Sequence, residues 1–113
     1  MSMQPNNLLS SIPEPASGEV FTLLLQCRNV TIERIVSAPG TVSDLFVQEQ
    51  DEWILLLQGS ADLQMADRTV KLKQGDSFFI PAQTPHQVTE TSVQPLCVWL
   101  AVHIHPETPP LAD

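Results

Sequence analysis

Residues 75–86 read GDSFFIPAQTPH, and residues 52–59 upstream of them read EWILLLQG. The first stretch begins with a Gly-Asp turn and continues as an apolar strand. It stops at Pro81, because proline has no N–H to donate to a neighbouring strand. We therefore predict two strands bounded by turns, which bring a carboxylate (Glu52) and an imidazole (His86) into one small barrel.

The rest of the chain has the same all-β rhythm. Short apolar blocks are separated by turn signals, none carries a long helical stripe, and ten prolines are spread among them. Prolines at this density would break helices of useful length. The predicted strands are 20–25, 30–36, 42–48, 52–58, 61–65, 69–72, 77–80, 87–91 and 96–104.

The predicted architecture is a β-sandwich closed into a jelly-roll barrel, because such barrels are built from many short strands and can enclose one small ligand. A chain of 113 residues has room for one core. We expect an N-terminal arm over residues 1–18, the barrel over 19–105 and a Pro-rich tail over 106–113.

The order of glycine, proline and histidine in the stretch 75–86 resembles the second sequence motif of the cupins, in particular the small single-domain cupins likened to sugar-phosphate isomerases. Gly75, Pro81 and His86 match that motif, whereas Gln83 replaces its second glycine. Glu90 stands at the motif's asparagine position. The resemblance covers about residues 19–105 and implies a cupin double-stranded β-helix.

The first cupin motif is matched only in part. Glu52 and Gly59 have its closing spacing, but the two metal-binding histidines of the family would fall near Phe46 and Gln48. The resemblance implies a lumen site for a divalent transition metal (Mn, Fe, Ni or Zn), held here by Gln48, Glu52 and His86. Imidazole and carboxylate together suit these metals, whereas an amide oxygen is a poor substitute for imidazole.

Several alternatives to this ligand set stay open. Gln50 could replace Gln48 if the preceding turn is one residue longer, and Glu49 could also approach. Glu52 could instead belong to a solvated turn with Asp51. With only two strong ligands, metal affinity would be low, and a metal-free pocket is a real alternative.

Two more histidines, His103 and His105, lie two apart on the last predicted strand and therefore share one face. They follow Glu52 in the chain, whereas the cupin histidine pair precedes it. We interpret them as surface or edge residues. The alternative is that His103 points into the lumen and completes the site.

Strand parity around Glu52 predicts how the protein assembles. If Glu52 points inward, so do Ile54, Leu56 and Gln58, and an apolar set headed by Trp53 faces the other side. A contiguous exposed patch of this kind needs a cover. We expect a homodimer, with the N-terminal arm as a second possible cover, and we interpret both tryptophans as packing residues.

Three classes of function remain. The first is a metal-dependent isomerase or oxygenase of a sugar or small carboxylate, in which Glu52 and His86 move protons as the catalytic residues. The second is a small-molecule binding or sensing module, and the third is a structural dimerisation domain. Resemblance of fold cannot choose among them.

Charge and hydropathy argue against nucleic acid and a membrane as partners. The net charge is −8 and only five Lys and Arg residues are present, which argues against nucleic acid. No apolar run is long enough to span a membrane, and the N-terminal segment does not resemble a signal peptide. We expect a cytoplasmic protein in which Cys27 and Cys97 are buried free thiols.

Overall fold

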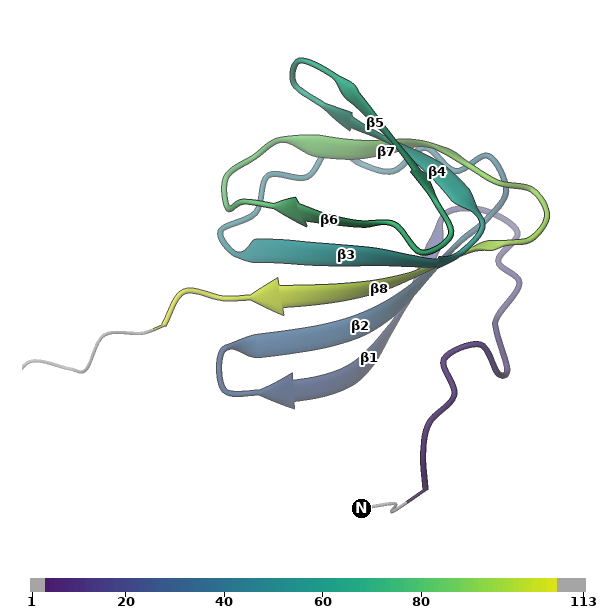
Figure 1. Cartoon of the computed structure of the whole chain (residues 1–113), viewed down its shortest axis with the longest axis horizontal. Helices are drawn as coiled ribbons and strands as arrows, with labels where there is room; N and C mark the ends of the chain where they lie inside the picture. The colour runs from purple at the N-terminus through teal and green to yellow at the C-terminus, as the bar shows by residue number, and fades with distance from the viewer. Residues whose placement is uncertain (1–3, 108–113) are drawn as a thin grey trace, which may run out of the picture.

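The computed structural model describes residues 4–107, which form eight β-strands and no helix (Figure 1). The strands are β1 (Glu19–Cys27), β2 (Val30–Ser37), β3 (Asp51–Gln58), β4 (Ser60–Met65), β5 (Thr69–Lys73), β6 (Ser77–Ile80), β7 (His86–Thr91) and β8 (Cys97–Ile104). In these residues there is accordingly no helix that could cross a membrane. Most of the predicted tail lies outside the described part of the chain.

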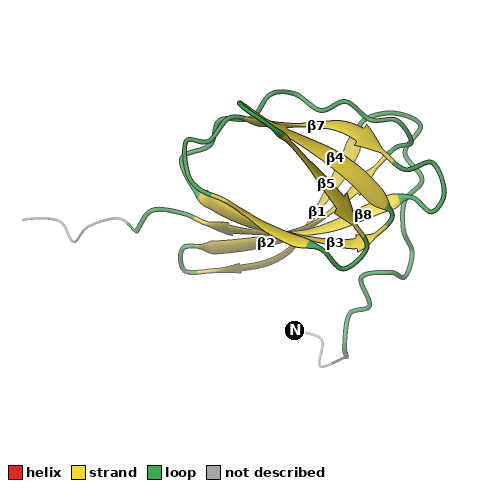
Figure 2. Cartoon of the chain, turned by 45° about the horizontal axis from the view of Figure 1, so that its top comes forward, coloured by secondary structure: helices red, strands yellow, loops and turns green. Residues whose placement is uncertain are grey.

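The strands form two antiparallel sheets that face each other across a lumen, which is the predicted all-β jelly roll (Figure 2). One sheet has the order β1-β2-β8-β3-β6, and the smaller one has the order β5-β4-β7. Because side chains alternate along each strand, one face of each sheet supplies the core. The buried apolar residues of that core are Ile35, Ile54, Leu56, Ala61, Leu63, Met65, Leu72, Ile80, Val88, Cys97, Trp99 and Ala101.

The predicted parity of β3 is confirmed at Glu52, Ile54 and Leu56, which are buried on the lumen side. Gln58 departs from it. A bulge between Leu56 and Gln58 shifts the register, and the half-buried Gln58 side chain donates a hydrogen bond to the carbonyl oxygen of Leu96.

The strand predicted over residues 42–48 is wrong. This segment forms only an isolated bridge, in which Phe46 and His86 exchange backbone hydrogen bonds of 2.8 and 3.0 Å. Three of its four apolar residues, Val42, Leu45 and Val47, are exposed, so the apolar character of the segment does not reflect burial. The segment nevertheless runs beside β7 and brings Phe46 and Gln48 to the lumen.

The prediction for the cysteines is half right. Both thiols are free, but Cys27 is exposed at the end of the edge strand β1, whereas Cys97 is buried. Burial raises the pKa of the Cys97 thiol to about 12.

The N-terminal arm touches the outer face of the larger sheet. Arg34 on β2 donates hydrogen bonds to the carbonyl oxygens of Leu8 and Ser10. The arm therefore covers one end of this face.

Gly59, between β3 and β4, is held in a tight site. Its φ is +89°, and a Cβ there would lie 3.0 Å from Cys97 Cα and 3.1 Å from the Leu96 carbonyl oxygen. Gly75 has a similar φ of +92° but open space around it. We predict that Gly75→Ala costs about 1–2 kcal/mol of stability through its backbone conformation alone.

Gly59→Ala should cost at least about 1 kcal/mol more, because backbone atoms must move as well. Urea denaturation of the two variants measures the difference. Equal losses would contradict the proposed close packing at Gly59.

Candidate functional site

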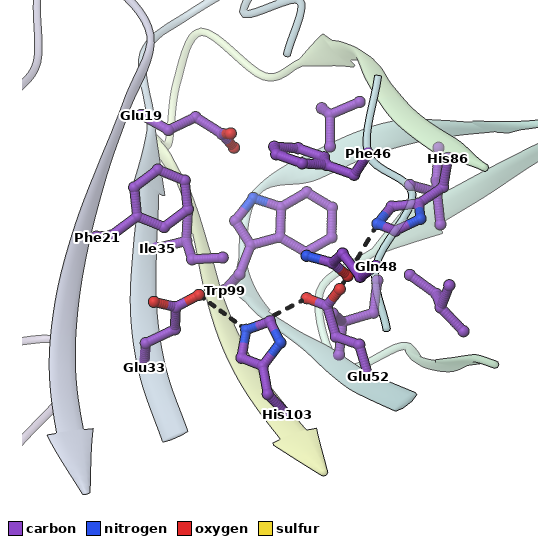
Figure 3. Close-up of a pocket in the computed structure, with 14 residues that line it drawn as sticks. Glu19, Phe21, Glu33, Ile35, Phe46, Gln48, Glu52, His86, Trp99 and His103 are labelled. Carbon is purple, nitrogen blue, oxygen red and sulfur yellow. Dashed lines mark hydrogen bonds and ion pairs between the residues drawn. The ribbon is translucent and has the colours of Figure 1, made fainter. Parts of the chain in front are cut away.

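Two carboxylates and two imidazoles from four strands meet in the lumen (Figure 3). Glu52 on β3 lies directly opposite His103 on β8, and Glu33 comes from β2 on the other side of β8. His86, at the start of β7, approaches from the smaller sheet. Antiparallel partners point to the same face, so the register places these groups together.

Glu52 is at the centre of this group, with its side chain only 8% exposed. Its Oε1 lies 3.6 Å from His86 Nε2, and its Oε2 lies 3.9 Å from His103 Nε2. Both distances exceed that of an ordinary hydrogen bond. The carboxylate is thus flanked by two imidazoles that can pair with it electrostatically, but neither imidazole lies within hydrogen-bond distance of it.

His86 has a defined tautomer. Its Nδ1 lies 2.9 Å from the carbonyl oxygen of Thr84, which can only accept a hydrogen bond, so Nδ1 carries a proton. In the neutral ring, Nε2 is then unprotonated and its lone pair faces Glu52. Burial acts to lower the pKa of His86, but Glu52 and the Thr84 carbonyl outweigh it, and the pKa is raised.

His103 has the opposite arrangement. The Gln50 amide donates to its Nδ1 over 3.2 Å, and its Nε2–H donates to Glu33 Oε1 over 2.9 Å. The hydrogen bond to Glu33 is the main cause of its raised pKa. Nε2 of His103 therefore carries a proton that is already bound to Glu33 and has no lone pair to offer a ligand.

The interpretation of His103 as a surface or edge residue is wrong, because it is buried and lines the cavity. Its parity with Trp99 and Ala101, which are both core residues, could have revealed this. His105 lies beyond the end of β8, within 3.2 Å of Thr31 Oγ1, and is not among the residues that line the cavity.

Of the three candidates before β3, Gln48 lines the cavity, Gln50 contacts His103 and Glu49 is exposed. The Oε1 atom of Gln48 is buried and has no hydrogen-bond partner within the described residues. A buried acceptor without a partner is costly and calls for an explanation. Figure 3 places this amide beside Glu52 and His86.

The cavity around these groups has a volume of about 70 Å³. This volume could hold roughly five to seven water molecules. Its walls are mainly apolar and aromatic, with the rings of Phe21, Phe46 and Trp99 among them (Figure 3).

A third carboxylate, Glu19, also lines the cavity. Burial raises its pKa, although the Ser37 hydroxyl donates to its Oε2 over 2.9 Å. Neither Glu19 nor Glu33 was expected from the sequence. Their signal is parity: each shares a strand face with an inward residue of the same strand, Phe21 and Ile35 respectively.

The side chains present do not make a tight transition-metal centre. Among residues 4–107, no group of three or more His, Cys, Asp or Glu side chains is arranged to hold a metal ion. The lumen offers two strong metal ligands, His86 Nε2 and the Glu52 carboxylate, and one weak ligand, the amide oxygen of Gln48. Any metal held by these three atoms would be held weakly.

Residues 34–104 match the Cupin_2 family, described as the cupin domain. The match spans more than half of the chain and includes Gln48, Glu52, His86 and His103. The protein therefore belongs to the cupin domain family, in agreement with the resemblance seen in the sequence.

Solved structures agree with this assignment. The chain is similar to a Ralstonia eutropha protein provisionally assigned as a mannose-6-phosphate isomerase, with 32% identity, 91% of this chain and 99% of that one covered, and a TM-score of 0.79. It is also similar to a Desulfitobacterium hafniense cupin superfamily protein, with 22% identity, 94% of each chain covered and a TM-score of 0.80.

A Streptococcus pyogenes protein of unknown function has 18% identity to this chain, with 96% of this chain and 92% of that one covered and a TM-score of 0.81. The similarities to the Desulfitobacterium and Streptococcus proteins show the fold alone.

The raised pKa of His103 makes a prediction about stability and pH. Its ordinary value is 6.5, so the stabilisation is fully present below about pH 6.5 and is lost as pH rises through the higher folded value. His86 adds a contribution of the same sign. Glu33→Gln removes the largest cause for His103, and we expect it to flatten the fall in stability above about pH 6.5.

Chemical denaturation at a series of pH values measures this slope. Glu90→Gln, at an exposed position on β7, is the matched control and should keep the wild-type slope. An unchanged slope in Glu33→Gln would rule out the assigned role of the Glu33–His103 pair.

Proposed function

We propose that this cupin binds a small hydrogen-bond-donating molecule in its lumen, at Gln48, Glu52 and His86. The observation that carries the proposal is the buried Gln48 Oε1 atom without a partner. It lies beside a carboxylate that no imidazole approaches to hydrogen-bond distance. A ligand with one or more donors would satisfy these acceptors at once.

Proton transfer at the same site is a second candidate. Glu52 and His86 are buried 3.6 Å apart, and the pKa of His86 is raised, which suits a group that exchanges a proton near neutral pH. The provisional assignment of the Ralstonia relative is to an isomerase, a reaction class that needs such exchange. In this case Glu52 and His86 would be the catalytic residues and Gln48 would position the substrate.

A weakly bound divalent metal (Mn, Fe, Ni or Zn) at Gln48, Glu52 and His86 is part of the proposal. It is supported by His86, whose Nδ1–H is fixed by a backbone carbonyl, as in most metal-binding histidines. Such an ion would polarise a bound oxygen group. The amide ligand limits its affinity.

Gln48→Leu tests the lumen binding site. The substitution removes the unpaired acceptor, so we expect the unliganded variant to be as stable as the wild type or more stable, by up to about 1 kcal/mol. The same variant should bind donor-bearing fragments, screened by ligand-observed NMR, at least about tenfold more weakly.

Gln74→Leu, at an exposed position, is the control and should leave binding unchanged. A Gln48→Leu variant that is clearly destabilised and binds fragments normally would show that Gln48 is a structural residue.

Metal content is a separate test. We expect protein purified from medium that supplies Mn, Fe, Ni and Zn to carry well below one equivalent of metal by elemental mass spectrometry, because only two strong ligands are present. Near-stoichiometric metal that disappears in His86→Ala would contradict weak binding and favour metal chemistry. Metal that is unchanged in His86→Ala would place it outside the lumen.

We further propose that the protein is a homodimer through the outer face of the larger sheet. An apolar row crosses all five strands there, because the register aligns Leu25, Ile32, Val102, Trp53 and Phe79 side by side. The two ends of the row, Leu25 and Phe79, are about half exposed. A second copy would cover this row without any further partner.

Val102→Asp places a charge in the middle of this row. We expect the variant to sediment as a monomer at concentrations at which the wild type is a dimer, because a buried unpaired carboxylate is costly. Val93→Asp, on the exposed loop before β8, is the matched control and should remain dimeric. A wild-type monomer, or a dimeric and folded Val102→Asp variant, would refute this interface.

A further inference from the structure

The charged groups around the cavity have an unusual balance. Three carboxylates, those of Glu19, Glu33 and Glu52, line it together with the two imidazoles, whereas no Lys or Arg does so within the described residues. The Nε2–H of His103 is already directed to Glu33, and the Nδ1–H of His86 to a backbone carbonyl. The cavity therefore offers many more acceptors than donors.

This balance disfavours anionic ligands. A phosphate or carboxylate group is normally held by Arg, Lys or several free backbone N–H groups. Neither cation lines the cavity, and no helix in residues 4–107 could present its N-terminal N–H groups to it. A sugar phosphate or a small carboxylate would bring negative charge next to Glu52.

The cavity walls provide a second and independent indication. The rings of Phe21, Phe46 and Trp99 line the same cavity as Glu19 and Glu52 (Figure 3). The faces of aromatic rings attract cations and at the same time pack against alkyl groups. A bare or hydrated metal ion would gain little from apolar walls. An alkylammonium ion can contact the aromatic ring faces with its charge and pack its alkyl part against them.

We propose that the lumen of this protein binds a small organic ammonium ion. The inference rests on the proposed lumen function and names its ligand class. The ammonium N–H groups would donate to Gln48 Oε1 and Glu52, and the alkyl part would lie against the aromatic rings. A cavity of about 70 Å³ limits the ligand to a few heavy atoms.

The test compares three probes of matched size by isothermal titration calorimetry at neutral pH: tert-butylammonium chloride, tert-butanol and inorganic phosphate. The first two have the same shape and differ in charge. We expect saturable binding of the ammonium ion, at least about tenfold tighter than binding of the alcohol, and no binding of phosphate.

Glu52→Gln should weaken ammonium binding at least about tenfold, and a circular-dichroism spectrum like that of the wild type would show that the variant is folded. Glu90→Gln, outside the cavity, should bind the ammonium ion as the wild type does.

Equal affinity for tert-butanol and tert-butylammonium would overturn the inference and leave the lumen function intact. Binding of phosphate that is lost in His86→Ala would do the same, as would ammonium binding that persists in Glu52→Gln. If none of the three probes binds but other donor-bearing fragments bind through Gln48, only the ammonium class is wrong. If those fragments also fail, the lumen function itself is refuted.

Discussion

The antiparallel register of β3 and β8 is the constraint on which the site depends. It places Glu52 opposite His103, with Ile54 opposite Ala101 one step further along the lumen face. A slip by one residue would turn every side chain of β3 over, exposing Glu52 and sending Trp53 into the core. The core packing of Ile54 and Leu56 therefore also fixes the position of the carboxylate.

Burial then gives the lumen its chemistry. Polar groups taken from water need partners, and most of those in this lumen have them: Trp99 donates to Ser37, Ser37 to Glu19, and His103 to Glu33. Glu52 and Gln48 are the exceptions. A ligand that donates hydrogen bonds would supply partners for these two acceptors and for the Nε2 atom of His86. This gain would favour its binding in a cavity that is otherwise apolar.

Much of the fold could be predicted from the sequence, because strand parity and turn residues are local signals. Eight of the nine predicted strands are present, and the inward position of Glu52 follows from the apolar residues that alternate with it. The failure at residues 42–48 has a physical cause: Val42, Leu45 and Val47 are exposed, and the backbone forms no continuous ladder with β7 but only the bridge at Phe46 and one hydrogen bond from Ser43 N–H to the Val88 carbonyl oxygen.

The site was harder to predict from the sequence than the fold. Besides Gln48, Glu52 and His86, it contains residues from strands that are distant in sequence. Glu33 and His103 meet only through the pairing of β2 with β8. The cytoplasmic location expected from the sequence stays a prediction.

The central claim is that His86 presents an unprotonated Nε2 to the lumen when the ring is neutral. The most direct measurement is the ¹⁵N chemical shift of the two ring nitrogens in the ligand-free protein, at a pH above the titration of His86. The account predicts a protonated Nδ1, bound to Thr84, and an Nε2 with the shift of a lone-pair nitrogen. A protonated Nε2 and a bare Nδ1 would contradict it, because the ring would then donate to Glu52 and leave far less for a ligand to satisfy.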